Sequence, residues 1–152
     1  IGYGASLHVF DPHGMSFDEY FGIREGMTRA ERIAAFGLGL VPGLAAAGVV
    51  DPARVDARAE RGPALISAIH LCTGLATTEV LRILLRRGTP SCAPRGLYFD
   101  PYRARLVRTR GSRGGWSGRA ARWLALRRFP SLLALHGEER DAIHAGQATG
   151  GK

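Results

Sequence analysis

A long apolar run in the middle of the chain, Pro63 to Arg87, most strongly limits what this sequence can fold into. Proline suits the first turn of a helix, and Gly88 suits its end. The first half of the run, through Ala76, is apolar on nearly every side, which predicts a central rather than a surface helix. Its apolar positions recur with helical spacing, at Leu65, Ile66, Ile69, Leu75, Val80, Leu81, Leu84 and Leu85. We therefore expect one long buried helix.

Short elements precede this helix. Ala5 to Phe10 mixes β-branched, aromatic and small residues and stops at the turn sequence Asp11 to Gly14, which predicts a short strand. Thr28, with Glu31 three positions later, has the pattern of a helix N-cap. The helix that follows is expected to run to about Leu40.

Two further strands are predicted after the long helix. Gly96 to Phe99 and Arg105 to Arg108 flank Asp100 to Arg103, a compact hairpin connection. Between the first strand and the first helix, Met15 to Ile23 is an aromatic-rich loop, and its three rings suggest that it packs against something. The whole pattern predicts a mixed α/β fold.

Charge is distributed unevenly over the 152 residues. The chain has 21 basic and 13 acidic residues, but the excess lies after residue 99, so we expect a globular region over residues 1–110 and a basic extension over 111–152. The extension opens with a glycine-rich linker, continues with helical spacing from Arg119 to Leu135, and ends in a segment, Gly146 to Lys152, expected to be disordered. Between Tyr102 and Arg128 the arginines are accompanied by Trp116 and Trp123 and by no acidic residue, a pattern that suits nucleic acid or a solvated face.

The cysteines and histidines predict no metal site. Cys72 and Cys92 are too few for a disulfide framework or a four-cysteine zinc site. Cys72 and His70 lie in the apolar run, so we expect an inert buried thiol and a core histidine there, and a more exposed Cys92. The remaining histidines, at positions 8, 13, 136 and 144, show no metal-binding spacing. The N-terminus has no signal-peptide pattern, which predicts a cytoplasmic setting.

Three stretches together resemble the C-terminal half of a ThiF-like adenylyltransferase, the family of the ubiquitin-activating and MoeB-type enzymes. They are Gly2 to Pro12, Gly62 to Gly88 with its run Thr78 to Leu85, and the paired strands over residues 96–108. The resemblance implies a Rossmann-like fold. Residues 1–110 would form its C-terminal portion, with mixed strands around one long buried helix, followed by the basic extension.

The implied activity is ATP-dependent activation of the C-terminal carboxylate of a ubiquitin-like or sulfur-carrier protein, with ATP and Mg as the implied cofactor. The family's glycine-rich phosphate loop and its catalytic arginine and lysine belong to the N-terminal half, and the sequence contains no GxGxxG. The family's paired CxxC zinc motifs are also missing, so we expect no zinc. The implied partners are the carrier protein and either a second copy of this chain or a complementing N-terminal half.

Two substrate-proximal elements follow from the resemblance. One fills the position of the family's crossover loop, which lies over the substrate tail, although simple hydrophobic packing would explain it equally well; it contains Met15, Ser16, Phe17, Tyr20 and Phe21. The other is formed by Arg61, Gly62 and Pro63, just before the long helix, where the helix dipole and the cation favour an anion. The alternative function is a non-catalytic binding module that scaffolds a carrier protein or binds nucleic acid through the arginine-rich tail.

Overall fold

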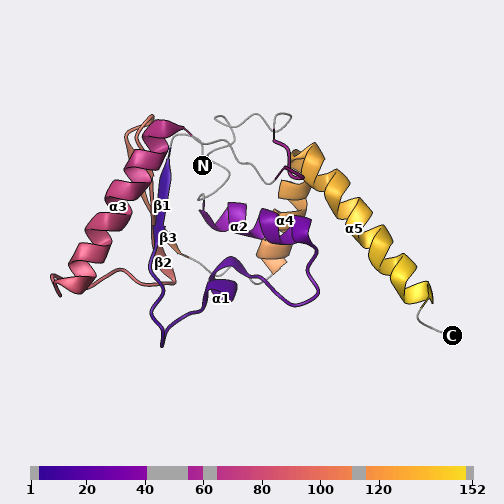
Figure 1. The fold of residues 1–152 in the computed structure, drawn as a ribbon, viewed down its shortest axis with the longest axis horizontal. Coiled ribbons are helices and arrows are strands. Elements are labelled where there is room, and N and C mark those ends of the chain that lie inside the picture. Colours follow the sequence, from indigo (N-terminus) through magenta and orange to yellow (C-terminus); the bar gives the residue numbers. More distant parts are fainter. Residues whose placement is uncertain (1–3, 41–54, 60–64, 111–115, 150–152) are drawn as a thin grey trace.

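A computed structural model describes residues 4–40, 55–59, 65–110 and 116–149. Within these residues, three strands and five helices follow one another as β1 (Ala5–His8), α1 (Phe17–Phe21), α2 (Arg29–Leu40), α3 (Ile66–Leu84), β2 (Arg95–Asp100), β3 (Arg105–Arg110), α4 (Trp116–Arg128) and α5 (Pro130–Thr149). The sheet lies between α3 on one side and α2, α4 and α5 on the other (Figure 1). The predicted mixed α/β class is confirmed.

The sheet is antiparallel throughout, in the order β1-β2-β3. β1 pairs with β2 so that His8 lies opposite Gly96, and Gly96 lies opposite Thr109 of β3. The predicted hairpin is confirmed: Asp100 accepts a hydrogen bond from the backbone N–H of Arg103 at 3.2 Å within the connecting turn. The first strand is shorter than expected, since it ends at His8 rather than Phe10.

The two short helices on one side of the sheet begin with side-chain caps. The Thr28 hydroxyl accepts from the Glu31 N–H at 3.2 Å, and the Glu31 carboxylate accepts from the Thr28 N–H at 2.9 Å. This capping box satisfies two N–H groups that the first turn of α2 leaves unpaired, which confirms the predicted helix start. The same pattern at Ser16 and Glu19 begins α1, a five-residue helix inside the stretch predicted as a loop.

α3 packs against β1, but its predicted burial is wrong. Only Ala68 and Glu79 are buried, and Leu71, Leu75 and Arg82 are half-buried on the same side. Only one stripe along α3 is buried, because β1, the strand against which the helix packs, has only four residues. The other sides remain exposed, with exposed fractions of 70% for Ile66 and 72% for Leu84.

The exposed side of α3 corrects two further predictions. His70 is exposed rather than a core residue, and Cys72 is exposed rather than buried. Both lie outside the stripe that faces the sheet. Cys92, in the loop before β2, is half-buried, so it is not the more exposed of the two cysteines as predicted. Among the described helices, none is long and apolar enough to cross a membrane.

The main hydrophobic core lies among α2, α4, α5 and the segment Val55–Ala59. Its buried members are Ala30, Ala34, Ala57, Ala125, Leu126, Leu132 and Leu135. The helix predicted from Arg119 to Leu135 is two helices, since α4 ends at Arg128 and Pro130 begins α5. Pro130 cannot donate an N–H within a helix but suits a first turn. α5 continues to Thr149, so residues 146–149 are helical where disorder was expected.

Polar contacts tie α5 to the beginning of α2. The Thr28 hydroxyl lies 3.0 Å from His136 Nδ1, and the Glu139 carboxylate accepts from the Ala30 N–H at 3.1 Å. A carboxylate at a helix N-terminus satisfies a free N–H and interacts favourably with the helix dipole. The C-terminal region is therefore held against the body of the protein by specific hydrogen bonds as well as by the core.

We expect Glu139→Gln to lower the free energy of unfolding by about 0.5–1 kcal/mol, because it removes the charge at the N-terminus of α2. Asp141→Asn, at an exposed acid on the same helix, is the matched control and should change stability by less. Urea unfolding followed by circular dichroism measures both. Equal effects of the two substitutions would contradict the proposed cap.

Candidate functional site

α1 is fixed over one face of the sheet by an aromatic cluster, which consists of Phe10, Phe17, Tyr20, Phe21 and Phe36 together with His8. Tyr20 and Phe21 form its centre, with ring centroids 4.9 Å apart. Phe17 and Phe36 each pack on Phe21, at 4.6 and 4.9 Å. Such tilted and edge-on ring contacts stabilise beyond simple area burial. The cluster thus joins β1, α1 and α2.

A polar contact beneath the cluster connects α1 to the far strand of the sheet. The Tyr20 hydroxyl lies 3.2 Å from the Thr109 hydroxyl of β3. Tyr20 and Phe21 are 2% and 5% exposed, so both side chains are buried beneath α1 and hold it in place. Glycines make room for these rings: a Cβ at Gly39 would overlap the Phe21 ring.

His8 is the polar member of the cluster. Its ring lies 4.9 Å from that of Tyr20 and 6.0 Å from that of Phe21. Both ring nitrogens are buried, and neither has a hydrogen-bond partner among the described residues. Burial lowers the pKa of His8 below its usual value, because the charged imidazolium loses hydration there. Burial therefore favours the neutral form of the His8 ring.

The residues predicted near a substrate are divided between the interior and the surface. Tyr20 and Phe21 are packed inside the cluster, Ser16 is the exposed N-cap of α1, Met15 is half-buried and Phe17 is 45% exposed. Met15, Ser16 and Phe17 thus form the accessible side of α1, which we call the α1 surface. The second predicted element, Arg61, Gly62 and Pro63, lies outside the described residues.

Sequence reasoning missed the structural importance of His8, Phe10 and Phe36. These residues lie outside the aromatic-rich stretch, and only the fold brings them to it. Phe10 is the last residue of the first predicted strand and Phe36 lies in the helix predicted after Thr28, so their hydrophobicity was the available signal. His8 gave none, because the residues it contacts, Tyr20 and Phe21, are more than ten positions away.

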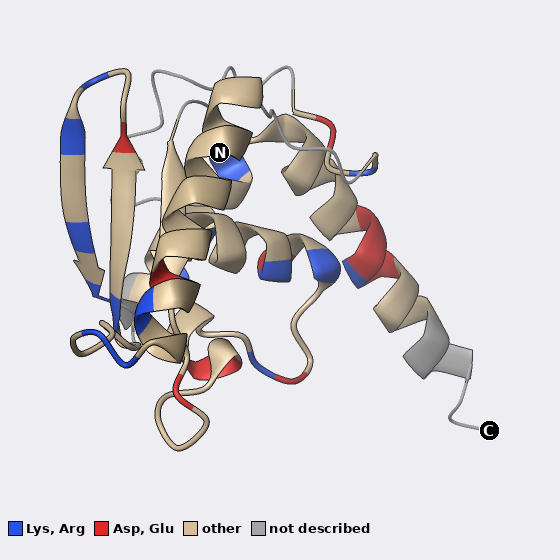
Figure 2. Ribbon diagram, turned by 60° about the vertical axis from the view of Figure 1, so that its left-hand side comes forward, with Lys and Arg blue, Asp and Glu red and all other residues tan. Residues whose placement is uncertain are grey.

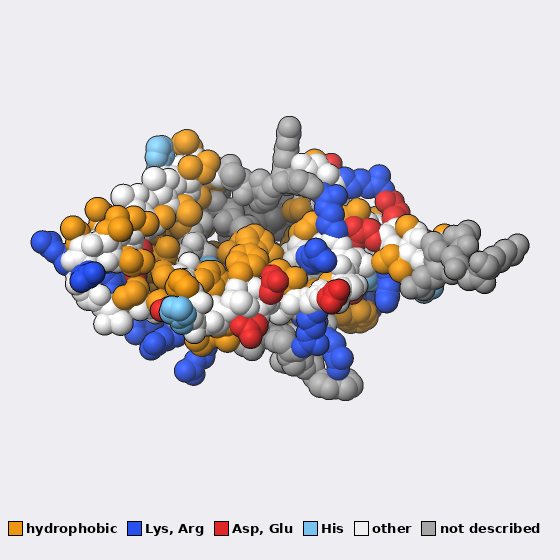
Figure 3. All heavy atoms as spheres, turned by 60° about the horizontal axis from the view of Figure 1, so that its bottom comes forward, with side chains coloured by type: hydrophobic (Ala, Val, Ile, Leu, Met, Phe, Trp, Pro, Cys, Tyr) orange, Lys and Arg blue, Asp and Glu red, His pale blue; other side chains and the backbone are white. Residues whose placement is uncertain are grey.

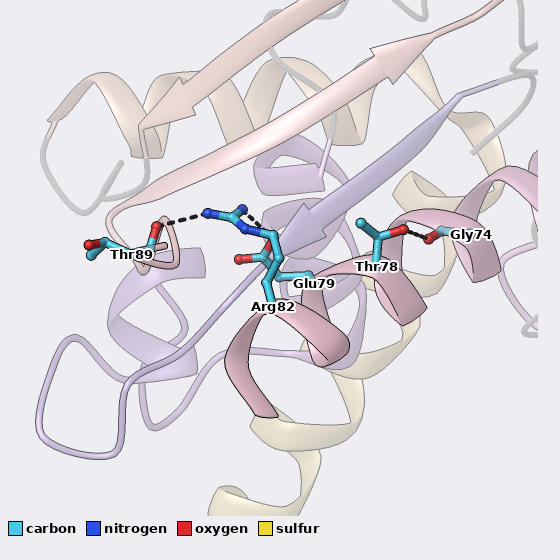
Figure 4. A network of polar contacts seen from close by, with 5 residues as sticks. All are labelled: Gly74, Thr78, Glu79, Arg82 and Thr89. Carbon is cyan, nitrogen blue, oxygen red and sulfur yellow. Dashed lines mark hydrogen bonds and ion pairs between the residues drawn. The ribbon is translucent and has the colours of Figure 1, made fainter. Parts of the chain in front are cut away.

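Glu79 is a buried carboxylate on α3 that the sequence did not single out. Its Oε2 accepts from Arg82 at 2.7 Å, and Arg82 also donates to the carbonyl oxygen of Thr89 at 3.0 Å. Figure 4 shows both side chains on one side of α3, with Arg82 reaching the loop beyond the helix. The second Glu79 oxygen is buried without a hydrogen-bond partner in the described part of the chain. This network anchors the loop that leads into β2.

The arginine-rich run is divided between two elements. Arg105, Arg108 and Arg110 are exposed on β3, the outer strand, where blue segments follow the strand in Figure 2. The other arginines with described side chains lie in the hairpin turn or on α4, which packs against α2 and α5. On α4, Arg127 lies 4.3 Å from the ring centre of Trp123. Arg119, Arg127 and Arg128 of α4 are exposed as well. Nucleic-acid binding by the arginine-rich run stays a prediction.

Among the described residues, no group of three or more His, Cys, Asp or Glu side chains could hold a metal ion. The N-terminus of α2 does not suit a phosphate, because the carboxylates of Glu31 and Glu139 already occupy it.

Comparisons with known proteins do not assign the chain to a family. No family model matches the sequence, and neither curated proteins nor solved structures give a significant match.

Gly96→Ala should destabilise the protein by about 1–3 kcal/mol, because overpacking a close contact forces side chains and backbone to shift. A Cβ at Gly96 would overlap both the His8 ring and the Thr109 hydroxyl. Gly137→Ala, on α5 where a Cβ meets nothing within 4 Å, is the control and should be neutral or stabilising. Thermal unfolding compares the two, and a neutral Gly96→Ala would show that His8 does not pack over the strand as described.

Lower pH should destabilise the protein through His8. The pKa of His8 is lower in the folded protein than in the unfolded chain. Between these two pKa values, the unfolded chain therefore binds more protons than the folded protein. Stability is therefore fully present above a pH of about 6.5 and decreases as pH falls below it. His8→Gln should flatten this dependence, whereas His13→Gln, at an exposed histidine, should not. Urea unfolding across this range tests the difference, and parallel curves for wild type and His8→Gln would contradict it.

Proposed function

We propose that this chain is the carrier-facing part of a ThiF-like adenylyltransferase, which activates the C-terminal carboxylate of a ubiquitin-like or sulfur-carrier protein with ATP. The nucleotide-binding half would come from residues outside this sequence or from another chain. The proposal rests on the resemblance of the three sequence stretches quoted above and on one structural observation. That observation is the position of β1 at the sheet edge, with α1 on one face and α3 on the other.

The edge position of β1 supports the proposal because a sheet can continue only at an edge. β2 occupies one side of β1, and none of the strands within the described residues occupies the other. An edge strand offers backbone N–H and C=O groups for pairing with a further strand. In the proposed enzyme, the parallel strands of the nucleotide-binding half continue the sheet from this side of β1.

The α1 surface supplies the contact for the carrier's tail in this proposal. Phe17 is partly exposed while its ring is fixed by Phe21 and Phe10, so little conformational freedom remains to be lost on binding. Tyr20 and Phe21 act as positioning residues, since they hold α1 from inside the cluster. None of these side chains is assigned to acid–base chemistry, because the activating groups are expected in the other half.

The exposed apolar side of α3 sets a condition that the proposed enzyme must meet. The resemblance implies a buried helix, whereas this chain covers only the stripe that faces β1. The proposed enzyme therefore requires another body against the outer side of α3. An enzyme in which that side remained in water would not fit the resemblance.

ATP–pyrophosphate exchange tests the proposed activity. The chain alone should show no exchange, and the chain joined to a glycine-rich nucleotide-binding half should show exchange that depends on a carrier ending in Gly-Gly. Phe17→Ala in the joined protein should raise KM for the carrier about tenfold, equivalent to about 1.4 kcal/mol, and leave KM for ATP unchanged.

Leu106→Ala, at a 61% exposed apolar residue on β3, is the control and should leave both KM values unchanged. Exchange in neither protein would contradict the proposed activity. Carrier binding without exchange would favour the non-catalytic binding module.

A further inference from the structure

Three arginines share one face of the outer two strands of the sheet. Gly96 and Thr109 face the aromatic cluster, since a Cβ at Gly96 would meet both the His8 ring and the Thr109 hydroxyl. Side chains alternate between the two faces of a strand. The residues next to Gly96 and Thr109 along the strands therefore face the opposite side, on which α3 lies (Figure 1). These residues are Arg95 of β2 and Arg108 and Arg110 of β3, and we call them the arginine face.

The pairing of the two strands brings the three arginines close together. Arg95 lies directly opposite Arg110 in the register of β2 and β3, and Arg108 is the next residue of β3 on the same face. Directly opposite residues of an antiparallel pair have Cβ atoms about 5 Å apart, and diagonal neighbours about 7–8 Å. Arginine thus occupies three positions of a block of four, and Leu97, opposite Arg108, occupies the fourth.

No acidic side chain among the described residues pairs with these arginines. All three are exposed, and none of them forms an ion pair or a side-chain hydrogen bond within the described part of the chain. The charged residues of α3 that lie toward the sheet, Glu79 and Arg82, are paired with each other. Like charges directly opposite one another destabilise a sheet. The contact between Arg95 and Arg110 is therefore unfavourable until an anion neutralises it.

The arginine face is accessible to a ligand. α3 packs against β1, at the opposite edge of the sheet from β3, so it leaves the outer strand uncovered. Blue segments lie on β3 and at the beginning of β2 in Figure 2. In Figure 3, arginine side chains project into solvent at the end of the molecule that α3 and the sheet form. Arginine is the side chain best suited to phosphate, because its planar guanidinium group donates two parallel hydrogen bonds to phosphate oxygens.

We propose that the arginine face binds a short chain of phosphate groups, of which tripolyphosphate is the simplest example. A single phosphate could neutralise Arg95 and Arg110 but would leave Arg108 without a counter-charge. A chain of phosphates carries its negative charges on adjacent groups and can contact all three arginines.

A single-stranded nucleic acid suits the block less well than a free phosphate chain. Such a strand also stacks its bases on aromatic rings, whereas the fourth position of the block is aliphatic. The proposed site is separate from the ATP site of the proposed enzyme, which is expected in the other half. It therefore does not depend on the adenylation proposal.

Thermal unfolding of the full chain with and without tripolyphosphate, in a magnesium-free buffer, tests the site. The reference contains sodium chloride at the same ionic strength, because salt alone screens the repulsion between the arginines. At about 100 times its Kd, tripolyphosphate should raise the Tm of the wild-type chain by about 5–10 °C. Isothermal titration calorimetry should give a Kd of about 10–100 µM.

Arg95→Gln and Arg110→Gln should each have two opposite effects. Either substitution should raise the Tm of the ligand-free chain, because the contact between like charges is lost. Either should also weaken tripolyphosphate binding about tenfold or more, because an arginine that donates to phosphate is lost. A purely structural role would not produce this combination.

Arg105→Gln is the matched control. Arg105 is exposed on the same strand, but it faces the other side of the sheet and lies opposite Asp100. The substitution removes the same charge from the chain and should leave the Kd for tripolyphosphate nearly unchanged.

Four outcomes would overturn the proposal. The first is a Tm of the wild-type chain that follows ionic strength alone. The second is an equal loss of affinity in Arg105→Gln, which would indicate general attraction by net charge. The third is binding of ATP but not of tripolyphosphate, since recognition would then depend on the nucleoside. The fourth is tighter binding of single-stranded RNA through the same arginines, which would assign the face to nucleic acid.

Equal binding of ATP and tripolyphosphate supports the proposal, because both carry the same chain of phosphates. None of these measurements involves pyrophosphate exchange, so a failed exchange assay leaves them unaffected.

Discussion

The packing around β1 determines how the two helical layers meet the sheet. Side chains alternate between the two faces of a strand, so a strand of four residues supplies two positions to each side. On one side, Ser6 donates to the carbonyl oxygen of Leu40 in α2, and His8 enters the aromatic cluster. On the other side lies α3. β1 thereby connects the α1 surface to the long helix, although it contributes few residues to either.

Helix starts and turns were predictable from the local sequence, whereas the packing of distant segments against one another was not. The Thr28–Glu31 capping box was read correctly, because both residues and their N–H groups lie within one turn. The same pattern at Ser16 and Glu19 was overlooked because the surrounding rings suggested a loop. The hairpin around Asp100 to Arg103 was also predictable, since turn residues separate two β-rich segments.

The exposure of α3 shows the limit of reading burial from hydrophobicity. The hydrophobicity of a helix indicates how much of its surface could be buried. How much is buried in fact depends on how many other elements pack against it. Here three strands cover one stripe, and Cys72 and His70 fall outside it. The candidate site was limited in the same way: the rings of α1 were visible in the sequence, but His8 and Phe36 join them only through tertiary packing.

The α1 surface and the outer side of α3 lie on opposite sides of the sheet (Figure 1). A body packed against the outer side of α3 would therefore leave Met15, Ser16 and Phe17 accessible. Among the described strands, β1 is at the edge of the sheet between these two sides, so a further strand could pair with it without displacing either helix. The cover that the proposed enzyme requires over α3 is thus compatible with an accessible carrier-facing surface on α1.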